Sequence, residues 1–152
     1  MKFPHIVKLL NNPNVNSVTK NNIIIAMGDL LHRFPNIIEP YNRYLYQNLH
    51  EEDVRVRKTT LTVITHLSLN DMIKVKSDMC DIALLFQDSN PEIESLVKQF
   101  FHEMNKKDPK TLFNLIPDAL SRFSNVEKLG NESTFKIFLE NIIPLLEKDK
   151  YS

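Results

Sequence analysis

Three segments of the sequence align at an offset of 37 residues: KNNIIIAMGDL at Lys20–Leu30, RKTTLTVITHL at Arg57–Leu67 and ESLVKQFFHEM at Glu94–Met104. Each segment repeats one mostly apolar stripe at positions i, i+3, i+4 and i+7, which is the spacing of one face of an amphipathic helix. A fixed offset of this size is typical of stacked helical repeats. The aligned columns are Ile23, Thr60 and Val97; Ala26, Val63 and Phe100; Met27, Ile64 and Phe101; and Leu30, Leu67 and Met104.

A second helix in each repeat follows the same offset. Two helices in a repeat of about 37 residues indicate the HEAT or armadillo type, because tetratricopeptide repeats are shorter and carry Trp, Gly and Tyr at set positions. This chain has no Trp, and its two glycines are Gly28 and Gly130. The aligned columns of the second helix are Ile38, Val75 and Leu112; Leu45, Ile82 and Ala119; and Leu49, Phe86 and Phe123.

The repeats predict an all-α fold, a HEAT/armadillo-type α-solenoid (α-α superhelix) of about three to four helix pairs. We place the pairs at roughly 1–34, 37–70, 74–105 and 109–147, within a single domain that covers residues 1–152. Terminal repeats normally carry a polar outer face, whereas apolar residues such as Leu10 and Leu146 lie near the two ends of this chain. We therefore expect a segment of a much longer solenoid.

Helix-capping residues predict several boundaries independently of the apolar stripes. The first long helix should stop before Pro35, because proline disfavours helical geometry in its predecessor. The last helix should run from Ser133 to about Leu146, with Pro144 kinking it or ending it early. The predicted caps are Asn16 or Ser17, Asp53, Asn90 and Asp108, the last two followed by proline at the first helical position.

The composition excludes several classes of protein. Nineteen Lys and Arg residues balance nineteen Asp and Glu residues, so any contact with nucleic acid must come from a local patch. Cys80 is the only cysteine, which excludes an internal disulfide and a cysteine-based zinc site. The longest apolar runs are too short to span a bilayer, and the N-terminus lacks the apolar core of a signal peptide. We expect a soluble, intracellular protein without a membrane partner.

No constellation of residues predicts catalysis. The pair His102-Glu103 begins like a metalloprotease motif, but Lys106 stands where the second histidine would be needed. The five histidines never occur at metal-ligand spacing, and two glycines cannot build a phosphate-binding loop. We therefore predict that the protein is not an enzyme and that it holds no cofactor and no metal.

A basic stretch, Val54–Lys76, is the remaining candidate site. Arg57 is expected to pair with Asp53 in the turn before its helix, a structural arrangement usual in HEAT repeats. The other cations either form a solvated rim or neutralise DNA phosphates without reading the base sequence. These candidate DNA-binding residues are Arg55, Lys58, Lys74 and Lys76.

Several strings are more specific than the periodicity. They are NNIIIAMGDL at 21–30, RFPN at 33–36, VRKT at 56–59, THL at 65–67 and LNDMIKVK at 69–76. Together they resemble the condensin complex subunit 1 family, the non-SMC HEAT-repeat subunits of condensin, in their C-terminal HEAT region. The resemblance covers roughly Lys20–Arg122. It departs from the family at Ser77, where glycine is common after the lysine-valine-lysine run.

This resemblance implies a non-catalytic subunit that acts in mitotic chromosome condensation. It implies as partners the kleisin, other condensin subunits and double-stranded DNA or chromatin, with no small-molecule substrate, and it assigns the ATPase to other chains. It also implies a location in the nucleus and on chromosomes, with a cytoplasmic pool. The balanced charge supports a second hypothesis, a generic HEAT/armadillo scaffold for protein–protein interaction that does not bind nucleic acid.

Overall fold

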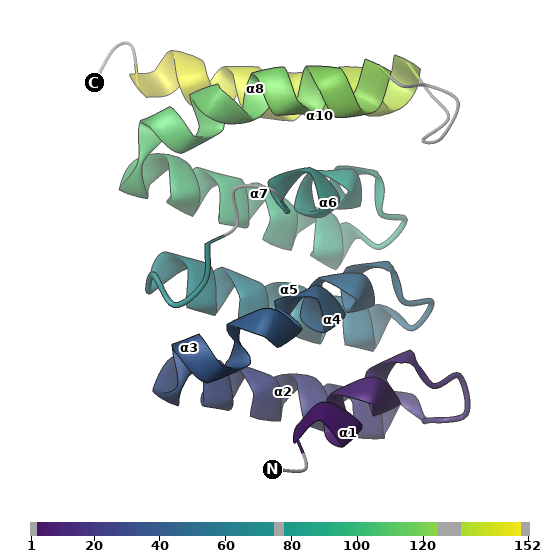
Figure 1. Cartoon of the computed structure of the whole chain (residues 1–152). Coiled ribbons are helices and arrows are strands. Elements are labelled where there is room, and N and C mark those ends of the chain that lie inside the picture. Colours follow the sequence, from purple (N-terminus) through teal and green to yellow (C-terminus); the bar gives the residue numbers. More distant parts are fainter. Residues whose placement is uncertain (1–2, 75–77, 125–131, 150–152) are drawn as a thin grey trace. The chain divides into compact units, whose positions relative to one another are not determined.

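A computed structural model describes residues 3–74, 78–124 and 132–149 of the chain. Within these ranges the chain consists of helices and turns, with no strand (Figure 1). It divides into two compact units, Met1–Lys74 and Val75–Ser152. Both units are built from helix pairs, which confirms the predicted all-α helical-repeat fold class. The single-domain organisation of residues 1–152 stays a prediction.

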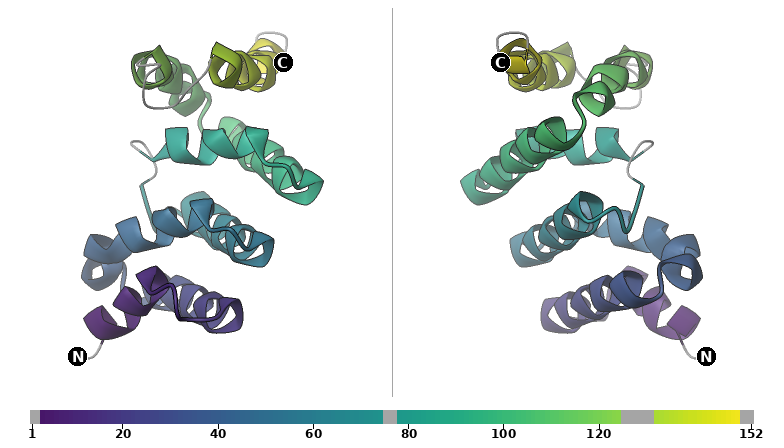
Figure 2. Two further views of the ribbon diagram at one scale, coloured as in Figure 1. Left: turned by 90° about the vertical axis from the view of Figure 1, so that its right-hand side faces the viewer. Right: turned by 90° about the vertical axis from the view of Figure 1, so that its left-hand side faces the viewer.

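Unit 1 contains two helix pairs. The first helices of the pairs lie on one side, and the long helices α2 and α5 lie next to each other on the other side (Figure 2). The first pair comprises α1 (Phe3–Lys8), the 3₁₀ turn η1 (Leu9–Asn11) and α2 (Ser17–Arg33). The second pair comprises α3 (Pro35–Ile38), η2 (Glu39–Tyr41), α4 (Asn42–Gln47), η3 (Asn48–His50) and α5 (Val54–Leu69).

Unit 2 also contains two pairs, and the long helix of its first pair packs on the second pair. The amide of Asn105 donates a hydrogen bond of 3.2 Å to the carbonyl of Leu145, which ties the two pairs together. The first pair comprises α6 (Met79–Ala83), η4 (Leu84–Gln87) and α7 (Pro91–Lys107), and the second comprises α8 (Pro109–Ser124) and α10 (Glu132–Asp149).

Proline shapes the helix ends only in part as predicted. Helix α2 stops at Arg33, before Pro35, as expected. In the next element Pro40 lies in a 3₁₀ turn, because its nitrogen cannot donate the hydrogen bond that would continue the α-helix. The prediction that Pro144 might end the last helix early is wrong, since α10 continues past it to Asp149.

The predicted N-caps are present. The Oδ1 atoms of Asn16, Asp53 and Asn90 accept hydrogen bonds of 2.8, 2.8 and 2.9 Å from backbone N–H groups in the first turns of α2, α5 and α7. The Oδ1 atom of Asp108 accepts a hydrogen bond of 3.1 Å from the backbone N–H of Lys110 in the first turn of α8. Each cap satisfies an amide that has no partner inside its helix.

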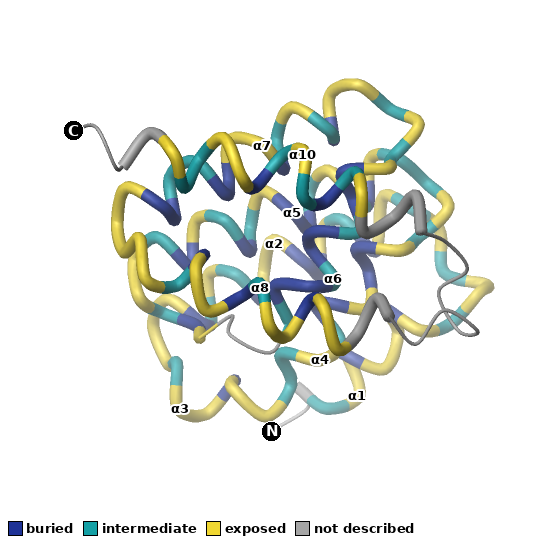
Figure 3. The backbone as a smooth tube through the Cα atoms, turned by 90° about the horizontal axis from the view of Figure 1, so that it is seen from above, coloured by how far each residue is buried: buried dark blue, intermediate teal, exposed yellow. Residues whose placement is uncertain are grey.

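The described residues of the apolar columns are buried or half-buried, with one exception. Met27, Ile64 and Phe101, which occupy one column, are at most 1% exposed, and buried and exposed residues alternate along the helices (Figure 3). The exception is Ala26, which is exposed, whereas Ile24 and Leu31 of the same helix are fully buried. Helix α2 therefore presents these larger side chains to the core, because they remove more apolar surface from water than Ala26 would.

Gly28 allows α2 and α5 to approach closely. A Cβ atom at this position would lie 2.9 Å from Cγ1 of Val63, which is closer than carbon atoms pack. A branched side chain such as Val63 has little freedom to move away on a helix. The absence of a side chain at Gly28 therefore sets the spacing of the two helices.

Candidate functional site

The predicted cations lie at both ends of α5, and the amino-terminal end is tied into the fold. The guanidinium of Arg55 donates to the carboxylate of Asp53, with Nη2 3.2 Å from Oδ2. Ser17 at the start of α2 also hydrogen-bonds this carboxylate. The bonds from Arg55 and Ser17 hold the pKa of Asp53 well below its usual range.

Arg57 contacts the same turn, but through the backbone. Its Nη1 atom donates hydrogen bonds of 2.8 Å to the carbonyls of both Glu51 and Glu52. The guanidinium of Arg55 bonds the Asp53 carboxylate, and the predicted pairing of Arg57 with Asp53 stays a prediction. Carbonyls of a tight turn point outward together, and a guanidinium has enough donors to bind two of them.

A partly buried ion pair that the sequence did not predict completes this end. Nζ of Lys20 lies 2.7 Å from Oε1 of Glu51, and the side chains are 9% and 29% exposed. Lys20 belongs to α2 and Glu51 to the turn before α5, so the pair links the two helix pairs of unit 1. We call this set of linked residues the turn ladder: Ser17, Lys20, Glu51, Asp53, Arg55 and Arg57.

The carboxy-terminal end of α5 is different. Asp71 adopts a left-handed conformation with φ of 59°, and the N–H of Met72 donates to the carbonyl of Leu67 at 2.9 Å. This 6→1 bond with a left-handed residue is the Schellman type of helix end. Ile73 is only 7% exposed and anchors the turn, while Lys74 is exposed and has no ion-pair partner among the described residues.

The three predicted DNA-binding residues that the structure describes therefore do not form one compact patch. Helix α5 has 16 residues and a length of about 24 Å. Arg55 and the exposed Lys58 lie in its first turns, and Lys74 lies beyond its last turn. Lys76 lies outside the described residues.

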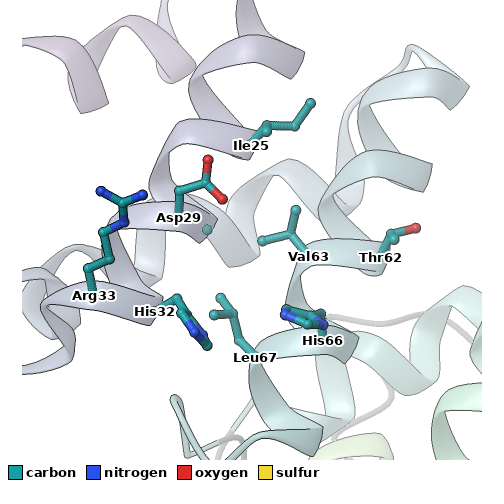
Figure 4. A pocket seen from close by; sticks show the side chains of 9 residues that line it. Ile25, Asp29, His32, Arg33, Thr62, Val63, His66 and Leu67 are labelled. Carbon is teal, nitrogen blue, oxygen red and sulfur yellow. The ribbon is translucent and has the colours of Figure 1, made fainter.

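A groove between α2 and α5 escaped the sequence analysis. It has a volume of about 430 Å³, and Ile25, Gly28, Val63 and Leu67 line it together with polar side chains (Figure 4). The rings of His32 and His66 have centroids 6.2 Å apart. Neither histidine indicates this groove by itself, because the two rings come from different helices. The 37-residue offset contains a signal, because it pairs Ile25 with Thr62 and Asp29 with His66, the wall residues of the groove. The polar wall residues are Asp29, His32, Arg33, Thr62 and His66.

Within the described residues, no three His, Cys, Asp or Glu side chains gather where they could hold a metal ion. Among the same residues, no helix combines the length and the apolar character that crossing a bilayer requires.

Comparison with known proteins supplies the family. The model of the family described as non-SMC mitotic condensation complex subunit 1 matches residues 18–152. Condensin complex subunit 1 of Homo sapiens is 38% identical over 133 residues, which is 88% of this chain and 9% of the human protein. The Xenopus laevis protein of the same name is 40% identical over 131 residues, 86% of this chain and 10% of that protein.

A plant relative gives a similar match. The condensin-1 complex subunit CAP-D2 of Arabidopsis thaliana is 40% identical over 133 residues, 88% of this chain and 9% of its own length. The chain thus spans about a tenth of the length of these curated relatives. The family match over most of the chain confirms the resemblance read from the sequence, and the chain belongs to the family of non-SMC subunit 1 of the mitotic condensation complex.

Proposed function

We propose that this chain is a non-catalytic helical-repeat segment of a condensin subunit, which binds the DNA backbone and other condensin subunits, the kleisin among them, in mitotic chromosome condensation. Its location is then the nucleus and the chromosomes, with a cytoplasmic pool. The family match supports the role in condensation. The helix pairs support a scaffold, because such repeats offer extended surfaces to partners.

The observation that carries the DNA-binding part is the exposed turn after α5. Lys74 has no ion-pair partner among the described residues, and the Schellman-type turn and the buried Ile73 fix the backbone just before it. Lys76 follows two residues later in the sequence. Two cations on a short segment suit contact with successive phosphates, which are sequence-independent ligands.

Arg55 and Lys58 are less well placed to bind DNA phosphates. The guanidinium of Arg55 already bonds Asp53, so a phosphate would have to compete with a carboxylate for it. Their distance from Lys74 along α5 also means that a duplex would have to lie along the helix to contact all four cations. We therefore expect Lys74 and Lys76 to contribute most of the binding, and Arg55 and Lys58 to contribute less.

The test is fluorescence anisotropy of a short duplex over a salt series. The Lys74→Ala/Lys76→Ala variant should bind more weakly to every sequence, and its salt slope should fall by about 2, close to one unit per lost phosphate contact. The matched control is Arg55→Gln/Lys58→Gln, with the smaller effect. A variant that combines all four substitutions provides the decisive result. If its DNA affinity and salt slope equal those of the wild type, this basic stretch does not bind DNA.

A second candidate function is a protein-interaction scaffold that never contacts nucleic acid. The turn ladder favours it, because there the cations serve the fold. Under this hypothesis the wild-type chain shows no salt-sensitive DNA binding even at low ionic strength, so the same titration separates the two functions.

A further inference from the structure

A second groove lies in unit 2, between α8 and α10. The two helices pack against each other and run side by side (Figure 1 and Figure 2). The groove has a volume of about 520 Å³, and its apolar lining includes Phe113 of α8 and Ile143 and Leu146 of α10. Lys110 of α8 and Glu147 of α10 belong to its two opposite walls. We call it the α8–α10 groove.

The apolar lining of this groove is largely exposed. Phe113 is 67% exposed and Ile143 is 42% exposed, although each directly follows a fully buried residue of the core, Leu112 and Ile142 respectively. Leu120 is 48% exposed and lies seven residues after Phe113, and therefore on the same flank of α8. Both helices thus carry more apolar surface than the core of unit 2 covers. Adjoining apolar residues at a surface mark an interaction site.

The two walls of the groove carry opposite charges that the chain itself does not pair. Lys110 and Glu147 are exposed, and neither forms an ion pair among the described residues. By contrast, Lys136 and Glu140 of α10 lie 4.0 Å apart and compensate each other. The α8 wall therefore offers a cation, and the α10 wall an anion, to the molecule that covers the apolar lining between them.

We propose that a second copy of this chain covers the α8–α10 groove, with a two-fold axis along the groove. In this arrangement α8 of each copy lies over α10 of the other copy. Phe113 of one copy packs on Ile143 and Leu146 of the other, and Lys110 of one copy pairs with Glu147 of the other. Each contact occurs twice, so four helices enclose one apolar centre.

The exposed apolar lining and the charges on the walls together favour a second copy over other occupants. A surface that forms a two-fold interface must be complementary to itself. Rotation about an axis along the groove places each wall over the opposite wall, so Lys110 and Glu147 of the two copies attract each other. A helix of an unrelated protein would cover the apolar lining without requiring opposite charges on the walls. A DNA duplex would leave that lining uncovered, and its phosphates would face Glu147.

Analytical ultracentrifugation of the full chain over a wide range of concentration measures the association. The wild type should show a reversible equilibrium between monomer and dimer. Phe113→Asp and Ile143→Asp should each raise the dissociation constant of the dimer about tenfold or more, because each substitution places two carboxylates in the apolar centre. Their thermal unfolding midpoints should stay near that of the wild type, since both positions are exposed in the monomer. Val18→Asp, at a 59% exposed position of unit 1, is the matched control and should leave the dissociation constant unchanged.

Charge reversal tests the pairing of the two walls. Lys110→Glu and Glu147→Lys should each weaken the dimer about tenfold, because like charges then face each other at both places. An equimolar mixture of the two variants should form a heterodimer about as strong as the wild-type dimer, because every cation in it again faces an anion. A wild type that stays monomeric at every concentration, a dimer that persists in Phe113→Asp, or a mixture that associates no better than its components would overturn the proposal.

This inference goes beyond the proposed function, because self-association needs neither DNA nor another condensin subunit. DNA titrations at protein concentrations below the dissociation constant of the dimer keep the two separate. Phe113→Asp should lose the dimer and retain the DNA affinity of the monomer, whereas Lys74→Ala/Lys76→Ala should lose DNA affinity and retain the dimer. Loss of both properties in both variants would contradict two independent surfaces.

Discussion

Basic residues lie at both ends of α5, but their contacts differ. At the amino-terminal end, Arg55 and Arg57 are bonded to a carboxylate and to two carbonyls of the preceding turn. At the carboxy-terminal end, Lys74 is exposed and has no ion-pair partner within the described residues. The helix dipole explains the difference, because a cation in the first turn opposes the dipole and needs a partner, whereas a cation at the other end does not.

A run of basic residues in the sequence therefore need not form one basic surface. Residues that are close along the chain lie at opposite ends of a helix about 24 Å long. The partners of each cation, rather than its charge, then distinguish a structural role from a role in binding.

The largest expected effect is the loss of the partly buried ion pair in the turn ladder. Glu51→Ala leaves the ammonium of Lys20, which is 9% exposed, without its partner. We expect the free energy of unfolding in urea to fall by about 2–3 kcal/mol, because an uncompensated charge remains largely buried. DNA binding should be unchanged.

The matched control replaces both members of the pair by apolar residues of similar size. Lys20→Met/Glu51→Leu should retain nearly wild-type stability, since neither charge is then buried alone. If Glu51→Ala lowers the free energy of unfolding by less than about 0.5 kcal/mol, the pair stabilises the fold no more than an ordinary surface ion pair does. The two ends of α5 would then differ less than their contacts suggest.

A second prediction uses pH to test Asp53. Its folded pKa is below the unfolded value, so the stability that its ionised form contributes is complete above the unfolded pKa. That stability is lost as the pH falls below about 4 through the folded pKa. Asp53→Asn keeps an N-cap but removes the charge, so its unfolding free energy should fall less steeply below pH 4 than that of the wild type.

Urea denaturation from pH 7 to pH 2.5 measures this difference. The other carboxylates contribute equally to both proteins and cancel in the comparison. Parallel curves for the two proteins would mean that the bonds from Arg55 and Ser17 do not stabilise the fold.

The smallest effect is expected at the carboxy-terminal end. Asp71 has a φ of 59°, a conformation that glycine adopts without the steric cost that a Cβ atom brings. Asp71→Gly should therefore raise the free energy of unfolding by about 0.5 kcal/mol, and Asp71→Ala should lower it by about 1 kcal/mol. Equal stability of the two variants would show that the left-handed turn is not maintained in solution.

Much of the fold could be predicted because its signals are local. The columns that contain Met27 and Ile64 lie in the core, and the caps Asn16 and Asn90 are formed. Ala26 was misplaced because a regular stripe does not say which neighbouring apolar residue fills the space best. The burial of Asn105 could not be predicted, because a polar residue shows no apolar pattern and its partner, the carbonyl of Leu145, is 40 residues away.

The sites were harder to predict for the same reason. The contacts of Arg57 with the carbonyls of Glu51 and Glu52 depend on the backbone path of the turn, which the residue pattern does not show. The groove was not predicted because His32 and His66 lie on different helices. No single stretch of sequence shows that their rings come close together. Only the alignment of the repeats placed their helices next to each other.

The turn ladder also has a mechanical consequence. It joins α2 to the turn before α5 by the bonds Lys20–Glu51 and Ser17–Asp53, both near the amino-terminal ends of these helices, while the groove lies toward their other ends. Two helices that are bonded to each other at one end can tilt apart most at the other end. A tilt of about 5° over a helix of about 24 Å would move the far end by about 2 Å. Tension applied across unit 1 would therefore widen the groove before it strained the bonds at the amino-terminal ends of the two helices.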